Sequence, residues 1–87
     1  MARRQKLLLK AMNNPRGLRF AEFTALIEAF GFEFDRQRGS HRYYVRADVR
    51  EVIDVQPRPD GKAKTAQVTE LLDLVERYAL RLLEDDA

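Results

Sequence analysis

The stretch GFEFDRQRGSHRYYV, residues 31–45, decides the fold because the spacing of the apolar residues changes there from a helical period to a strand period. Gly31 is a natural helix terminator. Directly after it, Phe32 and Phe34 alternate with acidic residues, which is typical of a strand with one solvated face. The Gly-Ser pair that follows predicts a turn, and the run HRYYVR predicts a second strand at residues 41–46.

Helices are expected on both sides of this stretch. The first begins near Arg19, and the apolar residues that we expect in its core-facing stripe are Phe20, Phe23, Ile27 and Phe30. Further on, EVIDVQ at residues 51–56 predicts a third strand, which prolines end. The second helix has Thr65 as its expected N-cap, and its apolar stripe comprises Val68, Leu71, Leu72, Val75, Ala79 and Leu82.

The expected order is therefore helix, three strands, helix. Short connections favour an antiparallel meander, and the stable arrangement is an α+β two-layer sandwich with both helices on one face of the sheet and the other face open. Leucines at residues 7–9 predict a short helical element, which NNPRG at residues 13–17 ends. We divide the chain accordingly into an N-terminal extension and linker, residues 1–17, and one domain, residues 18–87.

The composition indicates a globular protein, because 45% of the 87 residues are hydrophobic and 34% are charged. The absence of cysteine excludes disulfides and thiolate metal sites. Lys10 interrupts the leucine-rich start far short of a signal sequence or membrane span, so we expect a cytoplasmic protein with no membrane contact. The acidic end EDDA, residues 84–87, is expected to fray and has no assigned role.

Charge is distributed unevenly along the chain. Residues 1–46 carry 10 Lys and Arg against 4 Asp and Glu, whereas residues 47–87 carry 6 against 10, so that the two parts have net charges of +6 and −4. Such asymmetry points to contact with nucleic acid or a membrane surface, although a solvated basic face is the commoner explanation of a short charge run.

The order of elements and three stretches of sequence resemble the HicA family of toxins from prokaryotic toxin-antitoxin systems. RFAEFTALIEAFGFEF, residues 19–34, is similar to the first helix and strand of the family, and RGSHRYYV, residues 38–45, to its Gly-Ser-His strand. DVQPRPDGKAKTAQVTELL, residues 54–72, resembles the closing strand, basic loop and second helix of one branch. Arg42 stands where family members often have another histidine or an aliphatic residue.

The resemblance implies a fold like that of double-stranded-RNA-binding domains. It also implies a small ribonuclease of a type II toxin-antitoxin system, which cuts messenger RNA with the motif histidine as its catalytic residue. Carried over by motif, that role falls on His41, and no metal or cofactor is expected. A HicB-like antitoxin is implied as the partner that holds the toxin inactive.

The chemistry also follows from the residues. Cleaving RNA without a metal needs a group that takes the proton of the 2′-hydroxyl, a group that protonates the leaving oxygen, and positive charge near the phosphate. Histidine side chains titrate near neutral pH and suit either proton role. Arginine suits paired hydrogen bonds with phosphate, and residues 36–64 carry 8 Lys and Arg against 4 Asp and Glu. The predicted RNA-binding residues are Arg36, Arg38, Ser40, Arg42, Arg58, Lys62 and Lys64.

Several alternatives stay open at this point. Strand alternation places His41 on the same side as Tyr43, which is compatible with packing at the rim of the core as well as with catalysis. Tyr43 and Tyr44 must point to opposite faces, so that only one of them is available to stack on a base. No second proton-transfer residue is singled out by spacing. A non-catalytic RNA-binding module and a protein-interaction domain that pairs through its sheet edge remain as alternative functions, and the oligomeric state and cut-site preference are open.

Overall fold

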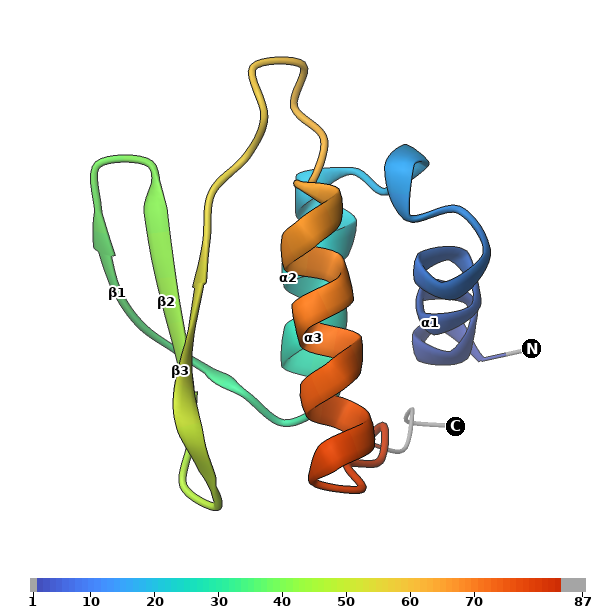
Figure 1. Cartoon of the computed structure of the whole chain (residues 1–87), viewed down its shortest axis with the longest axis vertical. Coiled ribbons are helices and arrows are strands. Elements are labelled where there is room, and N and C mark those ends of the chain that lie inside the picture. The colour runs from blue at the N-terminus through green and yellow to red at the C-terminus, as the bar shows by residue number, and fades with distance from the viewer. Residues whose placement is uncertain (1, 84–87) are drawn as a thin grey trace.

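The computed structural model describes residues 2–83 and confirms the predicted α+β order (Figure 1). Its elements are α1 (Arg3–Asn13), the short 3₁₀ turn η1 (Pro15–Gly17), α2 (Phe20–Ala29), β1 (Glu33–Arg38), β2 (His41–Arg46), β3 (Val49–Val55) and α3 (Thr65–Arg77). The acidic end at residues 84–87 lies outside the described residues.

The three strands form one antiparallel sheet in the order β1-β2-β3. Helices α2 and α3 both lie on one face of this sheet, with α3 in front of α2 in the view of Figure 1, and α1 lies on the far side of the helical layer. The opposite face of the sheet is open, as the sequence predicts. None of the helices in residues 2–83 has the length and apolar character that crossing a bilayer requires.

The core lies between the helical layer and the sheet. Helix α2 and the residue that caps its C-terminus contribute the largest share, because Phe23, Leu26, Ile27 and the cap Phe30 are each at most 1% exposed. Complete burial of such a side chain stabilises the fold by about 1.5–3 kcal/mol. The other buried apolar residues of the sandwich include Phe32, Tyr44, Ile53, Val55, Val68 and Leu71.

The structure corrects four details of the sequence prediction. The turn after β2 is shorter than expected, so β3 begins at Val49. Lys64, not Thr65, occupies the N-cap position of α3. Helix α3 ends at Arg77, before the last residues of the expected stripe, and Ala79 adopts a left-handed φ of 51° that no helix continues through. Phe34 is 53% exposed because β1 is the strand farthest from the helices.

Helix α1 is tied to the domain by packing and by charge. Ala11 is fully buried and belongs to the same core cluster as the residues of α2. The Lys10 ammonium donates to both carboxylate oxygens of Glu22, at 2.9 and 3.0 Å. Glu22 Oε1 also accepts the backbone N–H of Arg19, at 2.9 Å, which satisfies one of the free donors at the start of α2.

These contacts lower the pKa of Glu22 from its ordinary value of 4.5, chiefly through the hydrogen bond from Lys10 and then through the bond from the Arg19 backbone. A carboxyl group whose pKa is lower in the folded than in the unfolded chain stabilises the fold at every pH above its unfolded pKa. The stabilisation is lost as the pH falls through the folded pKa.

We predict that Glu22→Gln lowers the free energy of unfolding at neutral pH by about 1 kcal/mol, since it removes an ion pair and weakens a helix cap. The difference from the parent should shrink as the pH falls below 4.5, because the parent loses the same charge. Urea unfolding at several pH values measures both effects. Glu28→Gln, an exposed change on the same helix, is the control, and an equal cost for both substitutions would contradict the assignment.

Candidate functional site

His41 is the first residue of β2 and follows the turn that Gly39 makes with a left-handed φ of 57°. Its side chain lies on the open face of the sheet and is 43% exposed. Nδ1 of the imidazole lies 2.8 Å from Oδ1 of Asp54, which comes from the neighbouring strand β3. The histidine is therefore held at the surface by a carboxylate and does not pack at the rim of the core.

The contact with Asp54 sets which ring nitrogen of His41 faces the solvent. A carboxylate accepts hydrogen bonds, so we assign the proton of the neutral imidazole to Nδ1, where it is donated to Asp54. This leaves Nε2 as the nitrogen that can take a proton from, or give one to, a bound molecule. A carboxylate that fixes the tautomer and orientation of a histidine in this way is a recurrent arrangement in proton-transfer sites.

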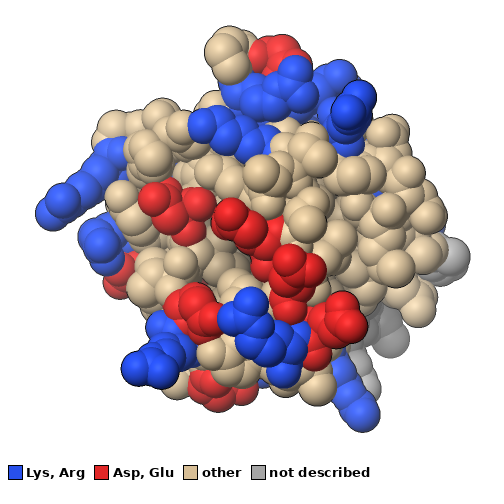
Figure 2. Space-filling view, in the orientation of Figure 1, with Lys and Arg blue, Asp and Glu red and all other residues tan. Residues whose placement is uncertain are grey.

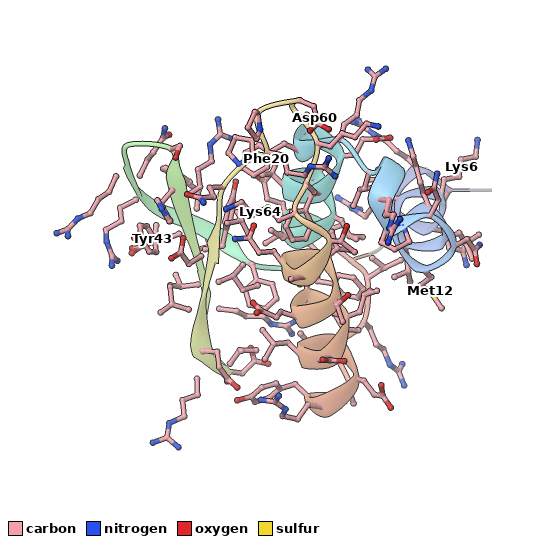
Figure 3. The ribbon with its side chains drawn as sticks, turned by 45° about the horizontal axis from the view of Figure 1, so that its top comes forward. Lys6, Met12, Phe20, Tyr43, Asp60 and Lys64 are labelled. Atoms are coloured by element: carbon pink, nitrogen blue, oxygen red, sulfur yellow. The ribbon has the colours of Figure 1, made fainter. Side chains whose placement is uncertain are left out.

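Tyr43 and Arg36 lie on the same face as the pair of His41 and Asp54. The rings of His41 and Tyr43 are stacked, with centroids 6.4 Å apart and planes inclined by 20°. The Arg36 guanidinium lies 4.4 Å from the centroid of the Tyr43 ring and also pairs with Asp35, at 2.6 Å. Strand register places Tyr43 directly between Arg36 and Asp54, and Figure 3 shows Tyr43 pointing away from the helices.

Two more predicted residues lie at the same end of the sheet. Arg38 is the cross-strand partner of His41. Neighbouring residues in register point to the same face, so Arg38 lies on the open face with the histidine. Ser40 lies in the turn between β1 and β2, and its hydroxyl approaches the side-chain oxygen of Gln56 at 3.5 Å.

Arg42 lies on the other face of the sheet. Its guanidinium sits 5.4 Å from the centroid of the Phe20 ring, at the start of α2. Because consecutive strand residues point to opposite faces, Arg42 and His41 do not share a surface, although they are adjacent in the sequence. The Phe20 backbone N–H bonds to the carbonyl of Gly61 at 3.0 Å, so Arg42 approaches the loop that precedes α3.

That loop carries the remaining predicted residues. Arg58 pairs with Asp60 at 2.9 Å, and the backbone N–H of Lys62 donates to the same carboxylate at 3.0 Å. Lys64 directly precedes the first turn of α3. Figure 3 places Asp60 and Lys64 beside Phe20 at the upper end of the molecule, where Figure 2 shows Lys and Arg side chains gathered.

The structure thus separates the predicted site into two groups. Arg36, Arg38 and His41 share the open face of the sheet. Arg42 lies on the helical face of the same end, and the other three residues, Arg58, Lys62 and Lys64, belong to the loop that precedes α3. Within residues 2–83, no three or more His, Cys, Asp or Glu residues gather as a metal site would require.

Asp54 is the site residue that the sequence analysis missed. Its alternation with the buried residues Ile53 and Val55 assigns it to the open face. The register of β3 against β2 brings Asp54 to His41, and the sequence pattern does not predict this register. Of the two tyrosines, Tyr44 is the buried one, at 2% exposure, and Tyr43 lies on the open face, as alternation requires.

Comparison with known proteins identifies the family of the chain. A family model described as the HicA toxin of bacterial toxin-antitoxin systems matches residues 20–75, which run from the start of α2 almost to the end of α3. Searches of curated proteins and of solved structures gave no match. Since the match covers well over half of the 87 residues, including both helices of the sandwich and the whole sheet, the chain belongs to the HicA toxin family.

Proposed function

We propose that this HicA toxin cleaves messenger RNA by proton transfer at His41, without a metal cofactor. The observation that carries the proposal is the 2.8 Å contact between His41 and Asp54 on an exposed sheet face. It leaves Nε2 of the histidine directed away from its partner, on a sheet face that also carries Arg36 and Arg38, whose guanidinium groups suit a phosphate.

In the proposed reaction, the 2′-hydroxyl of a bound ribose attacks the adjacent phosphorus atom. Nε2 of His41 takes the hydroxyl proton while Nδ1–H remains bonded to Asp54, whose charge stabilises the imidazolium that forms. The bond between phosphorus and the 5′-oxygen breaks, water supplies a proton to that oxygen, and the imidazolium returns its proton to the hydroxide that remains. The products are a 2′,3′-cyclic phosphate and a 5′-hydroxyl end.

Positive charge on the open face supports the transition state. Arg38 is the cross-strand neighbour of His41, and Arg36 is held over the Tyr43 ring. Guanidinium groups donate two parallel hydrogen bonds to phosphate oxygens. Such bonds stabilise the negative charge that these oxygens carry when the phosphorus is pentacoordinate in the transition state. The Tyr43 ring contacts both Arg36 and His41, so we assign it the role of orienting them rather than of stacking on a base.

The second basic group extends the RNA path beyond the catalytic face. We propose that the strand crosses the end of the sheet at Ser40 and continues over the loop of Arg58, Lys62 and Lys64. The loop leads into the first turn of α3, where free backbone N–H groups favour an anion. Arg42 lies on that side of the sheet and serves the same stretch of RNA.

Family membership implies a cognate antitoxin. We propose a HicB-like protein that covers the open face around His41, because an exposed catalytic side chain on a small domain is most simply silenced by steric cover. The antitoxin then competes with RNA.

Asp54→Asn tests the orienting role of the carboxylate. The amide keeps the size of the side chain but can present a donor to Nδ1, which favours the wrong tautomer. We expect single-turnover cleavage of labelled RNA in EDTA to slow by roughly 10- to 100-fold, less than the roughly 10⁴-fold seen for a buried aspartate-histidine pair. RNA affinity and melting temperature should stay near the parental values, and Asp54→Glu should recover part of the rate. Parental cleavage by Asp54→Asn would exclude the role.

Removing Lys62 and Lys64 together tests the RNA path. Counterion release makes the logarithm of the affinity fall with the logarithm of salt by roughly 0.7 per phosphate contact for single strands, so the double alanine variant should flatten this slope by up to about 1.4. Arg3→Ala with Lys6→Ala removes the same charge from α1, on the far side of the helical layer (Figure 3), and is the matched control. Equal slopes for the parent and the Lys62 and Lys64 variant would show that the loop does not hold phosphate.

A further inference from the structure

The outer edge of β3 lies open along a groove. Within residues 2–83, β3 pairs with β2 on one side only, and its other edge faces α3. The groove between them has a volume of about 300 Å³ and is lined by β3 residues 51–55 and by one flank of α3. A strand edge without a partner presents backbone N–H and C=O groups that a further strand can pair with.

Side chains close the groove at both ends. At one end, the backbone N–H of Gln56 donates to the side-chain oxygen of Gln67 at 3.2 Å. At the other end, Glu51 accepts hydrogen bonds from the Arg77 guanidinium at 2.6 Å and the Tyr78 hydroxyl at 2.5 Å. The hydrogen bond from the Tyr78 hydroxyl holds the pKa of Glu51 below its ordinary value, against the smaller opposing effect of burial. Within the described part of the chain, no side chain bonds to the outer backbone groups of β3 between these two ends.

The floor of the groove is apolar. Ile53 and Val55 from β3 and Leu71 and Leu74 from α3 line it and are buried. Side chains of an added strand that point toward the helices would cover this floor. Apolar residues, or the aliphatic stems of lysine and arginine, suit that position.

The rim of the groove is acidic. Glu51 is neutralised by Arg77, and Asp54 is engaged by His41, but Glu70 and Asp73 make no ion pair within the described part of the chain. Figure 2 shows Asp and Glu side chains running across this face, below the basic end of the molecule. An acidic rim repels RNA and attracts a basic protein segment.

The other edge of the sheet has the opposite character. Every residue of β1 is exposed, no helix lies beside it, and Arg36 and Arg38 belong to it. Those two arginines serve the proposed RNA site. Of the two free edges, only that of β3 therefore combines an apolar floor with unbalanced negative charge.

We propose that the groove between β3 and α3 receives an extended segment of the antitoxin, which carries basic and apolar residues and adds to the sheet as a fourth strand. The inference rests on the proposed function, because it takes the antitoxin as the occupant. An added strand would lie directly against Asp54, the residue that orients His41, so the body of the antitoxin would emerge beside the catalytic face.

Nuclear magnetic resonance of the full chain tests the proposal with a capped peptide of alternating valine and lysine, as long as β3 at seven residues. We expect saturable shifts of the amide signals of Val52, Asp54 and Leu71, and loss of binding when alternate peptide nitrogens are methylated. Glu70→Lys should weaken the peptide, and the complex with the full-length antitoxin, by about three- to tenfold.

Glu76→Lys makes the same charge change on α3 outside the groove and should leave both affinities unchanged. Equal weakening by the two variants, or peptide shifts that map to β1, would overturn the proposal. Cleavage of RNA is measured on the same samples. Groove binding without any cleavage would contradict the proposed ribonuclease alone, whereas cleavage with no groove binding would contradict the docking site alone.

Discussion

The burial of Tyr44 constrains the rest of the site. It is the central residue on the inner face of the middle strand, only 2% exposed, and its cross-strand neighbours are Phe34 and Ile53. Because side chains alternate along a strand, fixing Tyr44 in the core places His41 and Tyr43 on the open face. A slip of one residue would bury the histidine and expose the tyrosine, so the same packing that stabilises the sandwich also presents the imidazole.

The sheet also separates a basic surface from an acidic one. Its open face and its upper end carry arginines and lysines, whereas the flank between β3 and α3 carries unbalanced carboxylates. Asp54 stands at the boundary, since its side chain bonds to His41 and its strand forms the wall of the acidic groove. In our account, RNA and the antitoxin approach from opposite sides of this one strand. The antitoxin can then anchor on a surface that RNA avoids and still reach the catalytic face.

Local patterns predicted the elements well because their signals are local. The change of period after Gly31 and the turn residues before His41 predicted β1 and β2, and alternation predicted that the two tyrosines point to opposite faces without deciding which is buried. The end of α3 was wrong, because the apolar residues Leu80 and Leu82 continue to pack against the core after the helix has stopped at Arg77. An apolar stripe reports burial and does not by itself report where the backbone leaves the helix.

The site was predicted in part for a related reason. The motif singled out His41 as the candidate, whereas alternation alone left its role open. Its partner Asp54 depends on the register between two strands, which no local pattern encodes. Arg42 was grouped with His41 because the two are adjacent in sequence, although adjacency in a strand means opposite faces. The short turn between β2 and β3 likewise makes β3 begin at Val49. The start of β3 in turn determines that Asp54 is the carboxylate that reaches the imidazole of His41.

The most direct test is a joint measurement of melting temperature, RNA affinity and single-turnover cleavage in EDTA on one sample of His41→Ala. A histidine that transfers protons contributes about 10²- to 10⁴-fold to the rate, so cleavage should fall by that factor. Melting temperature should stay close to that of the parent, because the side chain is 43% exposed and lies outside the core. Affinity should also persist, since the arginines and lysines supply it. A destabilised variant that still cuts at the parental rate per folded molecule would contradict the central claim.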